Sequence, residues 1–181
     1  MKNPLSLSSL SECTYCATLG QDHVPSTGNP SASVMIIGQS PGAMEVREGK
    51  PFVGPSGELV DYMLDEAGLT REEVYIANVV KCRPAGNRPS HPEEKNNCWL
   101  NWLKLEIQSV DPQLILLLGK DAQEAVTPAS HPFGHLAEIS GKKRTYLTSY
   151  HPSYFLRKGK IEEFIKVGHK VEDILEEMEE E

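Results

Sequence analysis

Short apolar runs alternate with longer amphipathic segments along most of the chain. The apolar runs have the length of β-strands and lie at residues 33–38, 74–80, 114–118 and 145–150. The third run is apolar at every position, which is typical of a strand covered on both faces of a sheet. We therefore predict four strands, the second of which ends at Asn78.

The amphipathic segments have the spacing of helices, with apolar residues three and four positions apart. They cover residues 56–67, 90–110, 120–126 and 161–181. Ser90 and Glu93 have capping-box spacing, with Pro92 at the first helical position, so the second helix should begin there. Because strand and helix alternate four times, the pattern predicts an α/β protein of one domain, residues 1–181, in which helices cover both faces of a parallel sheet.

Composition adds little to this picture. The chain is 39% hydrophobic and 24% charged, as is ordinary for soluble globular proteins. No stretch is long and apolar enough to cross a membrane, and residues 1–12 lack the apolar core of a signal peptide. We therefore expect a cytoplasmic monomer without a membrane partner.

Charge is unevenly spread along the chain. The net charge is −8, but residues 172–181 carry seven acidic groups and no basic one, which leaves −1 for the rest. Basic side chains gather in residues 81–88 and 142–160. A solvated surface is the simpler explanation for such clusters, and a rim that contacts phosphates is the alternative.

The first predicted strand is followed by a sharp polar turn, GQSPG at residues 38–42. In an open α/β sheet, ligands bind at such corners, beyond the carboxyl ends of the strands. The loop over residues 39–56 is also long, and long ordered loops are commonly functional. A structural turn would explain the glycines equally well, but the other strand-like runs end in polar motifs too. The turn lacks the lysine and Ser/Thr of a phosphate-binding loop, so nucleotide hydrolysis is not supported.

The four cysteines form one constellation. Cys13 and Cys16 make a C-x-x-C pair, and Cys82 and Cys98 bracket a loop. Disulfides are uncommon in intracellular proteins, whereas zinc and an iron–sulfur cluster both accept four thiolates. The residues alone leave these two metal centres open. Either would tie the N-terminal segment to the loop between the second pair.

Five motifs, taken together with the cysteines, resemble family 4 of the uracil-DNA glycosylase superfamily, its iron–sulfur branch. They are GQSPG at 38–42, KPFVGPSG at 50–57, NVVKCRP at 78–84, GNR at 86–88 and HPSYFLR at 151–157. Their order and spacing are specific, although each motif alone is weak. The resemblance implies a three-layer α/β/α fold with a four-stranded parallel sheet, and a [4Fe–4S] cluster on the four cysteines rather than zinc. It also implies excision of uracil from single- or double-stranded DNA during base excision repair at the nucleoid.

The resemblance places the chemistry on residues near the strand ends. A uracil must leave the stack to be cleaved, and Phe52 is placed to stack on the extruded ring. Asn78 offers a donor and an acceptor that suit the O4/N3 edge of uracil, although it could simply tie down a strand end. His151 can donate to the negative charge that develops at O2. The other expected substrate contacts are Gly38, Ser40 and Ser153.

The resemblance also implies contacts with DNA around the flipped base. Phe155 or Leu156 is expected to fill the gap that the base leaves, and Ser153 with the neighbouring amides to hold a phosphate. The expected basic contacts to the DNA backbone are Lys81, Arg83, Arg88, Arg157 and Lys158.

The chain departs from the family pattern where the attacking water is handled. Gln39 stands where family 4 usually has a glutamate, and Ser40 replaces the catalytic aspartate of family 1. Family 4 has an acidic pair where this chain has Glu45-Val46, so Glu45 is the candidate that positions water or stabilises the sugar cation, held by Asn87. The catalytic candidates are thus Glu45, His151, Gln39 and Asn87.

Two alternatives to the repair enzyme remain. Gln39 and Val46 favour a DNA-binding homologue that keeps the pocket but has weak or no catalysis, or an altered base specificity. Covalent trapping of the abasic product by a loop histidine is the other alternative. His91 lies in the corresponding loop, but its surroundings do not match the branch that traps its product.

Overall fold

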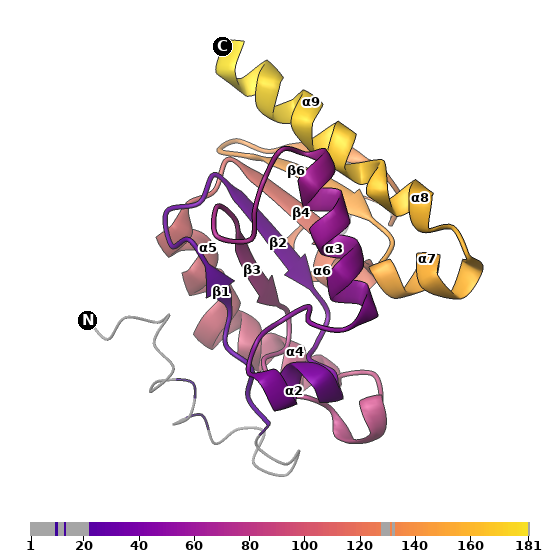
Figure 1. Ribbon diagram of the computed structural model, residues 1–181. Helices are drawn as coiled ribbons and strands as arrows, with labels where there is room; N and C mark the ends of the chain where they lie inside the picture. The colour runs from indigo at the N-terminus through magenta and orange to yellow at the C-terminus, as the bar shows by residue number, and fades with distance from the viewer. Residues whose placement is uncertain (1–9, 11–12, 14–21, 128–130, 132, 181) are drawn as a thin grey trace.

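The computed structural model in Figure 1 describes residues 10, 13, 22–127, 131 and 133–180. Within these residues the sheet has six strands in the order β1-β3-β2-β4-β6-β5. The four central strands are parallel: β3 (Tyr75–Asn78), β2 (Val34–Gly38), β4 (Leu114–Leu118) and β6 (Thr145–Ser149). The two edge strands are antiparallel to their neighbours: β1 (Thr27–Gly28) and β5 (Glu138–Ser140).

The prediction of a four-stranded parallel sheet is therefore wrong in size and in direction, because the sheet is six-stranded and mixed. The four predicted strands are present, and they form its centre. The two added strands are two and three residues long. Strands this short contain too few positions to show a period of two, so hydrophobic patterning could not reveal them.

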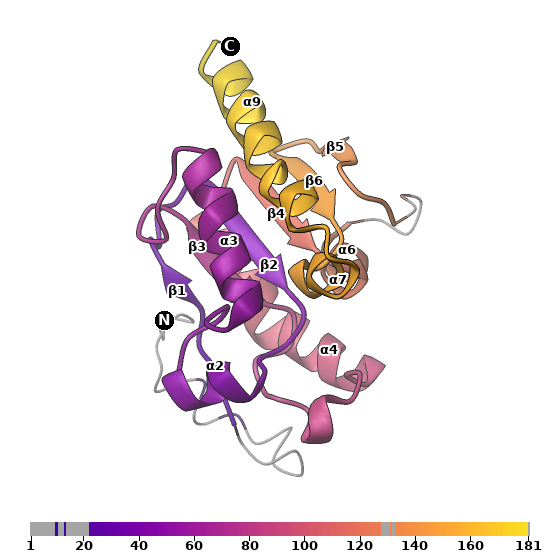
Figure 2. The same ribbon diagram turned by 45° about the vertical axis from the view of Figure 1, so that its right-hand side comes forward.

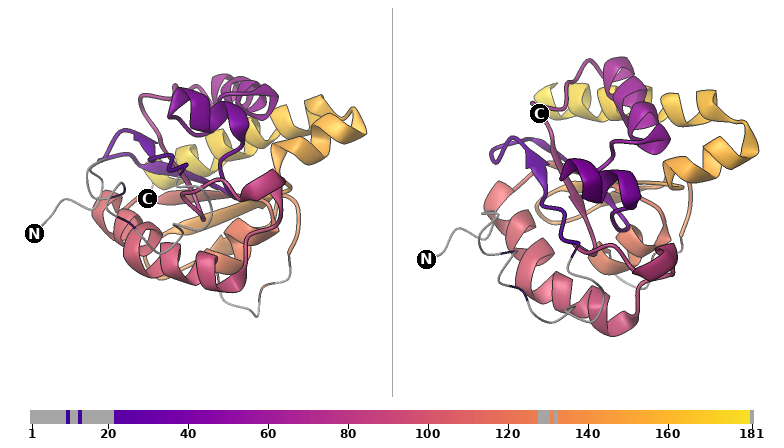
Figure 3. Two further views of the ribbon diagram at one scale, coloured as in Figure 1. Left: turned by 90° about the horizontal axis from the view of Figure 1, so that it is seen from below. Right: turned by 60° about the horizontal axis from the view of Figure 1, so that its bottom comes forward.

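Helices cover both faces of the sheet, as the strand–helix alternation predicts (Figures 1 and 2). One face carries α3 (Pro55–Glu66), α7 (Pro152–Lys158), α8 (Ile161–Ile165) and α9 (Val167–Glu180). The other carries α4 (Pro92–Cys98), the π-helical turn η3 (Trp99–Leu103), α5 (Lys104–Val110) and α6 (Lys120–Val126). The end view in Figure 3 shows the sheet between these two layers.

Alternate residues of the central strands supply the two cores. On β2, Val34 and Ile36 pack with α3 and the C-terminal helices, whereas Met35 and Ile37 pack with α5 and α6. All five residues of β4 are buried, as expected for a strand with both faces covered. None of the helices in the described part of the chain combines the length and apolar character needed to cross a bilayer.

Several helix boundaries differ from the predictions. Pro92 is the first residue of α4, so the cap falls on His91, whose backbone N–H donates to Glu94, rather than on Ser90. The predicted helix over residues 90–110 is interrupted by η3, and the last predicted helix is divided into α8 and α9. The long loop after β2 contains the short helix α2 (Ala43–Glu48), and the loop after β3 contains the turn η2 (Ala85–Asn87).

Candidate active site

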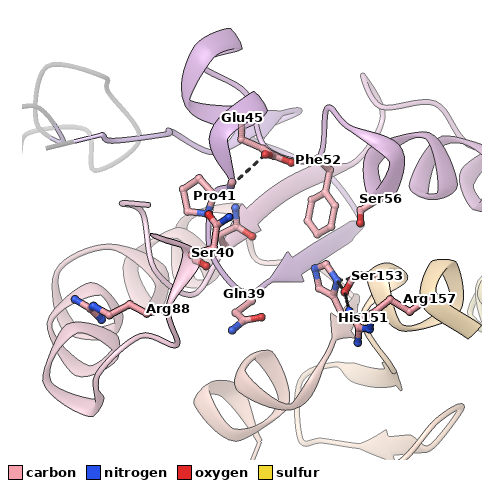
Figure 4. A pocket seen from close by; sticks show the side chains of 13 residues that line it. Gln39, Ser40, Pro41, Glu45, Phe52, Ser56, Arg88, His151, Ser153 and Arg157 are labelled. Carbon is pink, nitrogen blue, oxygen red and sulfur yellow. Dashed lines mark hydrogen bonds between the residues drawn. The ribbon is translucent and has the colours of Figure 1, made fainter. Parts of the chain in front are cut away.

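A cavity of about 520 Å³ lies beyond the carboxyl ends of the parallel strands (Figure 4). It is formed by the loop and helix α2 that follow β2, by the end of β3 and by the residues that follow β6. All four catalytic candidates line it: Gln39, Glu45, Asn87 and His151. Strand ends that are distant in the sequence thus meet at one site, as the topology of a parallel sheet dictates.

Four of the five expected substrate contacts also meet there, whereas Gly38 is not among the residues that line the cavity. Ser40, Phe52, Asn78 and Ser153 line the cavity. The rings of Phe52 and His151 face each other, with centroids 5.8 Å apart and planes inclined by 25°. Gly38 leaves room for the side chains of Phe52 and Asn78, because a Cβ atom there would be 2.4 Å from Phe52 Cζ and 2.7 Å from Asn78 Oδ1.

Phe52 has an uncommon backbone conformation, with φ at +52°. The guanidinium group of Arg71 holds this conformation by donating to three carbonyl groups. Its Nη1 lies 3.2 Å from Pro51 O and its Nη2 lies 3.1 Å from Gly57 O, and Nη2 also donates to Phe52 O. Asp61 in turn binds Nε of Arg71. A strained turn that is fixed from one side therefore presents the aromatic ring to the cavity.

Replacing Arg71 with lysine should loosen this turn. We expect a loss of about 1–2 kcal/mol in the free energy of unfolding, because one ammonium group cannot bind three carbonyl groups in a planar fork. If Phe52 stacks on the base, KM should rise while kcat changes less, because stacking stabilises ground and transition states alike. Urea unfolding and steady-state kinetics measure both effects. The control is Asp61→Asn, which alters the half-exposed partner of Arg71 but keeps the three bonds to carbonyl groups, so KM should stay unchanged. An unchanged KM in Arg71→Lys would argue against the role.

His151 is held in one orientation by Ser153. Its Nδ1 accepts from Ser153 N at 3.2 Å and lies 2.9 Å from Ser153 Oγ, which also accepts from Arg157 Nη1 at 3.2 Å. Because Nδ1 is an acceptor, the proton of the neutral ring is on Nε2. Burial, and secondarily the charge of Arg157, lower the pKa of His151 to about 4. The ring is therefore a neutral donor at physiological pH.

This depressed pKa predicts a loss of stability in acid. The unfolded chain binds a proton at His151 near its ordinary pKa, whereas the folded chain resists it, so stability falls as the pH drops from about 6.5 toward 4. Lowering the pH from 7 to about 5 should therefore reduce the free energy of unfolding by about 2 kcal/mol through this residue. Urea unfolding of the wild type and of His151→Asn at both pH values isolates it. Equal pH dependence in the two proteins would contradict the prediction.

Glu45 is placed by the start of α2. Its Oε2 accepts from the backbone N–H of Gly42 at 3.1 Å, and the side chain remains partly exposed at the cavity wall (Figure 4). Asn87 was expected to hold Glu45, but its side-chain oxygen has a different partner. The Oδ1 atom of Asn87 accepts from Arg83 Nε at 2.9 Å, so the hydrogen bond joins this cavity residue to a basic side chain.

Two of the residues expected to contact DNA are buried in the protein, where they cannot reach DNA. Lys81 is 2% exposed, in a stretch over residues 79–82 that is buried throughout, and its ammonium group binds Glu106. Phe155 is 1% exposed and packs between Tyr154 and Phe164, so it cannot fill a gap in DNA. Leu156 beside it is only partly buried.

The other expected DNA contacts lie at or near the cavity. Arg88 and Arg157 line it, and Arg88 also binds Glu94 at 2.8 Å. Lys158 is exposed and Arg83 is partly exposed. The backbone amide of Ser153 already donates to His151, so it is not free to hold a phosphate.

Three further residues line the cavity that sequence reasoning missed as site residues: Pro41, Gly42 and Ser56. All three lie inside the motifs that carry the family resemblance, which was the available signal. His91, the candidate for covalent trapping, is exposed at the start of α4 and is not among the residues that line the cavity.

The predicted metal ligands are partly described. Cys82 and Cys98 are each 2% exposed, Cys13 is partly exposed, and Cys16 lies outside the described residues. The segment after the C-x-x-C pair is held against Cys82, since Val24 N donates to Lys81 O at 2.8 Å and Arg83 N to Asp22 O at 3.2 Å. Among the described residues no three potential ligands gather at one point. Two buried thiols beside this segment are nevertheless donors of the kind that zinc and iron–sulfur clusters require.

The sequence profile of the uracil DNA glycosylase superfamily matches residues 25–174. The chain is also similar to three curated proteins named type-4 uracil-DNA glycosylase. The one from Archaeoglobus fulgidus is 36% identical over 162 residues, which cover 81% of each chain. The one from Thermotoga maritima is 36% identical over 154 residues, covering 81% of this chain and 79% of the relative. The one from Saccharolobus solfataricus is 37% identical over 161 residues, covering 80% of this chain and 74% of the relative.

Proposed function

Because the chain belongs to the uracil DNA glycosylase superfamily, we propose that it is a monofunctional glycosylase that excises uracil from DNA. The observation that carries the proposal is the meeting of Phe52, Asn78 and His151 in one cavity. An aromatic face, an amide and a neutral imidazole donor together match the face, the edge and the O2 atom of an extruded uracil. The type-4 relatives, named for the same activity, support it.

Base recognition is the first part of the mechanism. The flipped uracil stacks on Phe52, which contributes about 1–3 kcal/mol per base in comparable sites. The amide of Asn78 donates to O4 and accepts from the N3–H of the ring. Cytosine presents a donor and an acceptor in the reverse order, so it leaves the amide mismatched. A buried mismatch costs about 1–3 kcal/mol for each unpaired group.

Bond cleavage is the second part. As the glycosidic bond breaks, electrons move onto the uracil ring and the sugar becomes positive. The Nε2–H of His151 donates to the developing charge at O2, and its proton is available there because Ser153 occupies Nδ1. Glu45, on the opposite wall of the cavity in Figure 4, stabilises the sugar cation or positions the attacking water. The products are free uracil and an abasic site.

Contacts with the DNA backbone come from side chains around the cavity. Arg88 and Arg157 line it, with Arg83 and Lys158 nearby in the sequence, and Leu156 is the side chain available to enter the gap left by the base. We propose that a single copy of the chain binds single- or double-stranded DNA in this way, and that it does so at the nucleoid.

We also propose that Cys13, Cys16, Cys82 and Cys98 hold a [4Fe–4S] cluster. Similarity to the type-4 relatives supports the cluster over zinc, whereas the thiol donors suit either centre. Its contribution is structural, since it would fasten the N-terminal segment beside the loop that carries Arg83, Asn87 and Arg88. Iron and acid-labile sulfide analysis, with zinc measured in the same sample, distinguishes the two metal centres.

The activity is tested on a labelled oligonucleotide that contains a single uracil. Incubation with protein of known iron content should make the strand alkali-labile at that position and release free uracil, whereas a strand with cytosine should stay intact. Salt-dependent binding without excision would select the non-catalytic alternative, which the sequence departures at Gln39 and Val46 favour but which the geometry of the described residues does not. A protein–DNA band that survives denaturing conditions would instead indicate covalent trapping.

A further inference from the structure

A buried ion pair lies behind Asn78, away from the cavity wall. Lys81 is 2% exposed and Glu106, on α5, is 4% exposed, and Nζ lies 2.5 Å from Oε2. Removing two charges from water is so costly that an apolar pair of similar volume commonly stabilises a protein as well or better. Stability alone therefore does not account for this pair.

The ammonium group of Lys81 binds the main chain of Asn78. β3 ends at this residue, and its buried carbonyl group accepts from Lys81 Nζ at 3.0 Å. The next two backbone amides donate to the carbonyl groups of Gly38 and Gln39, each at 3.0 Å. The strand end that carries the Asn78 side chain into the cavity is thus hydrogen-bonded on both sides, and Lys81 supplies the hydrogen bond on one side.

Glu106 is itself fixed in place. Its Oε1 accepts from Tyr75 Oη at 3.0 Å and from Ser26 Oγ at 2.5 Å, and Ser26 Oγ also accepts from Lys81 Nζ at 3.1 Å. Burial, reinforced by the charge of Glu106, raises the pKa of Tyr75, so the phenol keeps its proton and remains a donor. Tyr75 and Ser26, from two separate parts of the chain, therefore hold the carboxylate that binds Lys81.

We infer that the Lys81–Glu106 pair positions Asn78 for recognition of uracil. The inference rests on the proposed function and adds two positioning residues to it. An apolar pair could fill the same volume, but it could not donate to the Asn78 carbonyl group. Without that bond the strand end relaxes, and the amide moves relative to Phe52 and His151. A displacement of about 1 Å in a positioning group can lower the rate by about 100-fold.

The test is the double variant Lys81→Met/Glu106→Leu, which removes both charges and keeps the volume. We expect the variant to stay folded, with a melting temperature close to that of the wild type, because the removal of two buried charges offsets the lost hydrogen bonds to Ser26, Tyr75 and the Asn78 carbonyl group. In the same protein kcat/KM for uracil excision should fall by about 10- to 100-fold, and inhibition by free uracil should weaken by about 10-fold. Affinity for an undamaged oligonucleotide should stay unchanged, which a general loss of structure would not allow.

A matched control removes a different ion pair. Lys95 Nζ and Asp121 Oδ1 lie 2.7 Å apart between α4 and α6, and neither residue lines the cavity. Lys95→Met/Asp121→Leu should keep kcat/KM within about twofold of the wild type. A wild type without excision would refute the proposed function. A fully active wild type with an equally active Lys81→Met/Glu106→Leu would refute the positioning role alone.

Tyr75→Phe covers the case in which the double variant does not fold. It removes one hydroxyl group that binds Glu106 and leaves the rest of the network in place. We expect kcat/KM to fall by about two- to fivefold and the inhibition constant of free uracil to rise by the same factor, both smaller effects than in the double variant. If the double variant is unfolded and Tyr75→Phe matches the wild type in both constants, the inference is overturned.

Discussion

Replacing His151 with alanine lowers kcat for uracil excision by about 10²- to 10³-fold, which is the usual effect of removing one preorganised donor to a developing oxyanion. KM changes little, because the charge on O2 develops only in the transition state. Single-turnover excision from a uracil-containing oligonucleotide measures the rate, and binding of the same strand measures the affinity.

The matched control is His91→Ala, which removes an exposed histidine at the start of α4 and should leave the rate unchanged. The low pKa of His151 adds a second signature. Because the neutral ring is the donor, the acid limb of kcat that this group causes lies near pH 4, well below the ordinary pKa of histidine. Full activity in His151→Ala, or an acid limb near 6.5 that disappears in this variant, would contradict the assignment.

Replacing Asn78 with alanine lowers kcat/KM for uracil by about 10²- to 10³-fold. The change leaves two polar groups on the edge of a buried base without partners, at about 1–3 kcal/mol each. Because the amide also sets specificity, preference for uracil over other flipped bases should decrease. Release of free bases from a panel of damaged oligonucleotides measures both effects.

Asn101→Ala is the control for this variant, since Asn101 is exposed and its amide donates to Asn97, four positions earlier in the chain. It should match the wild type on every substrate of the panel. If Asn78→Ala kept both the rate and the specificity of the wild type, Asn78 would serve only to end β3. The inference that Lys81 and Glu106 position Asn78 for base recognition would then be refuted as well.

The meeting of the catalytic candidates in one cavity was predictable from the sequence because these residues follow strands. Asn78 ends β3 and His151 follows β6, and parallel strands bring their carboxyl ends to one edge. The connection between Asn87 and Arg83 was not accessible, because it depends on the turn η2. The relation between Phe52 and Arg71 was also hidden. It joins residues nineteen positions apart through a backbone angle that no pattern reports.

The direction of individual side chains was the least predictable feature. Lys81 and Phe155 lie within the motifs expected to bind DNA, and both point into the protein. A basic or aromatic residue in a motif has a chemical character that the sequence states, but its exposure depends on what packs against it. Glu106 lies 25 positions from Lys81 and supplies the charge that makes burial of the lysine possible.

The order of strands and helices, the two-sided burial of β4 and the residues that gather at the strand ends were determined by the sequence alone. These features follow from local periodicity and from the geometry of parallel crossover connections, which each segment carries within itself. Only the tertiary structure decided the two edge strands, the division of the C-terminal helix, and which motif residues line the cavity and which are buried. Each of these depends on contacts between segments far apart in the chain, and the free energy of such contacts outweighs local preference.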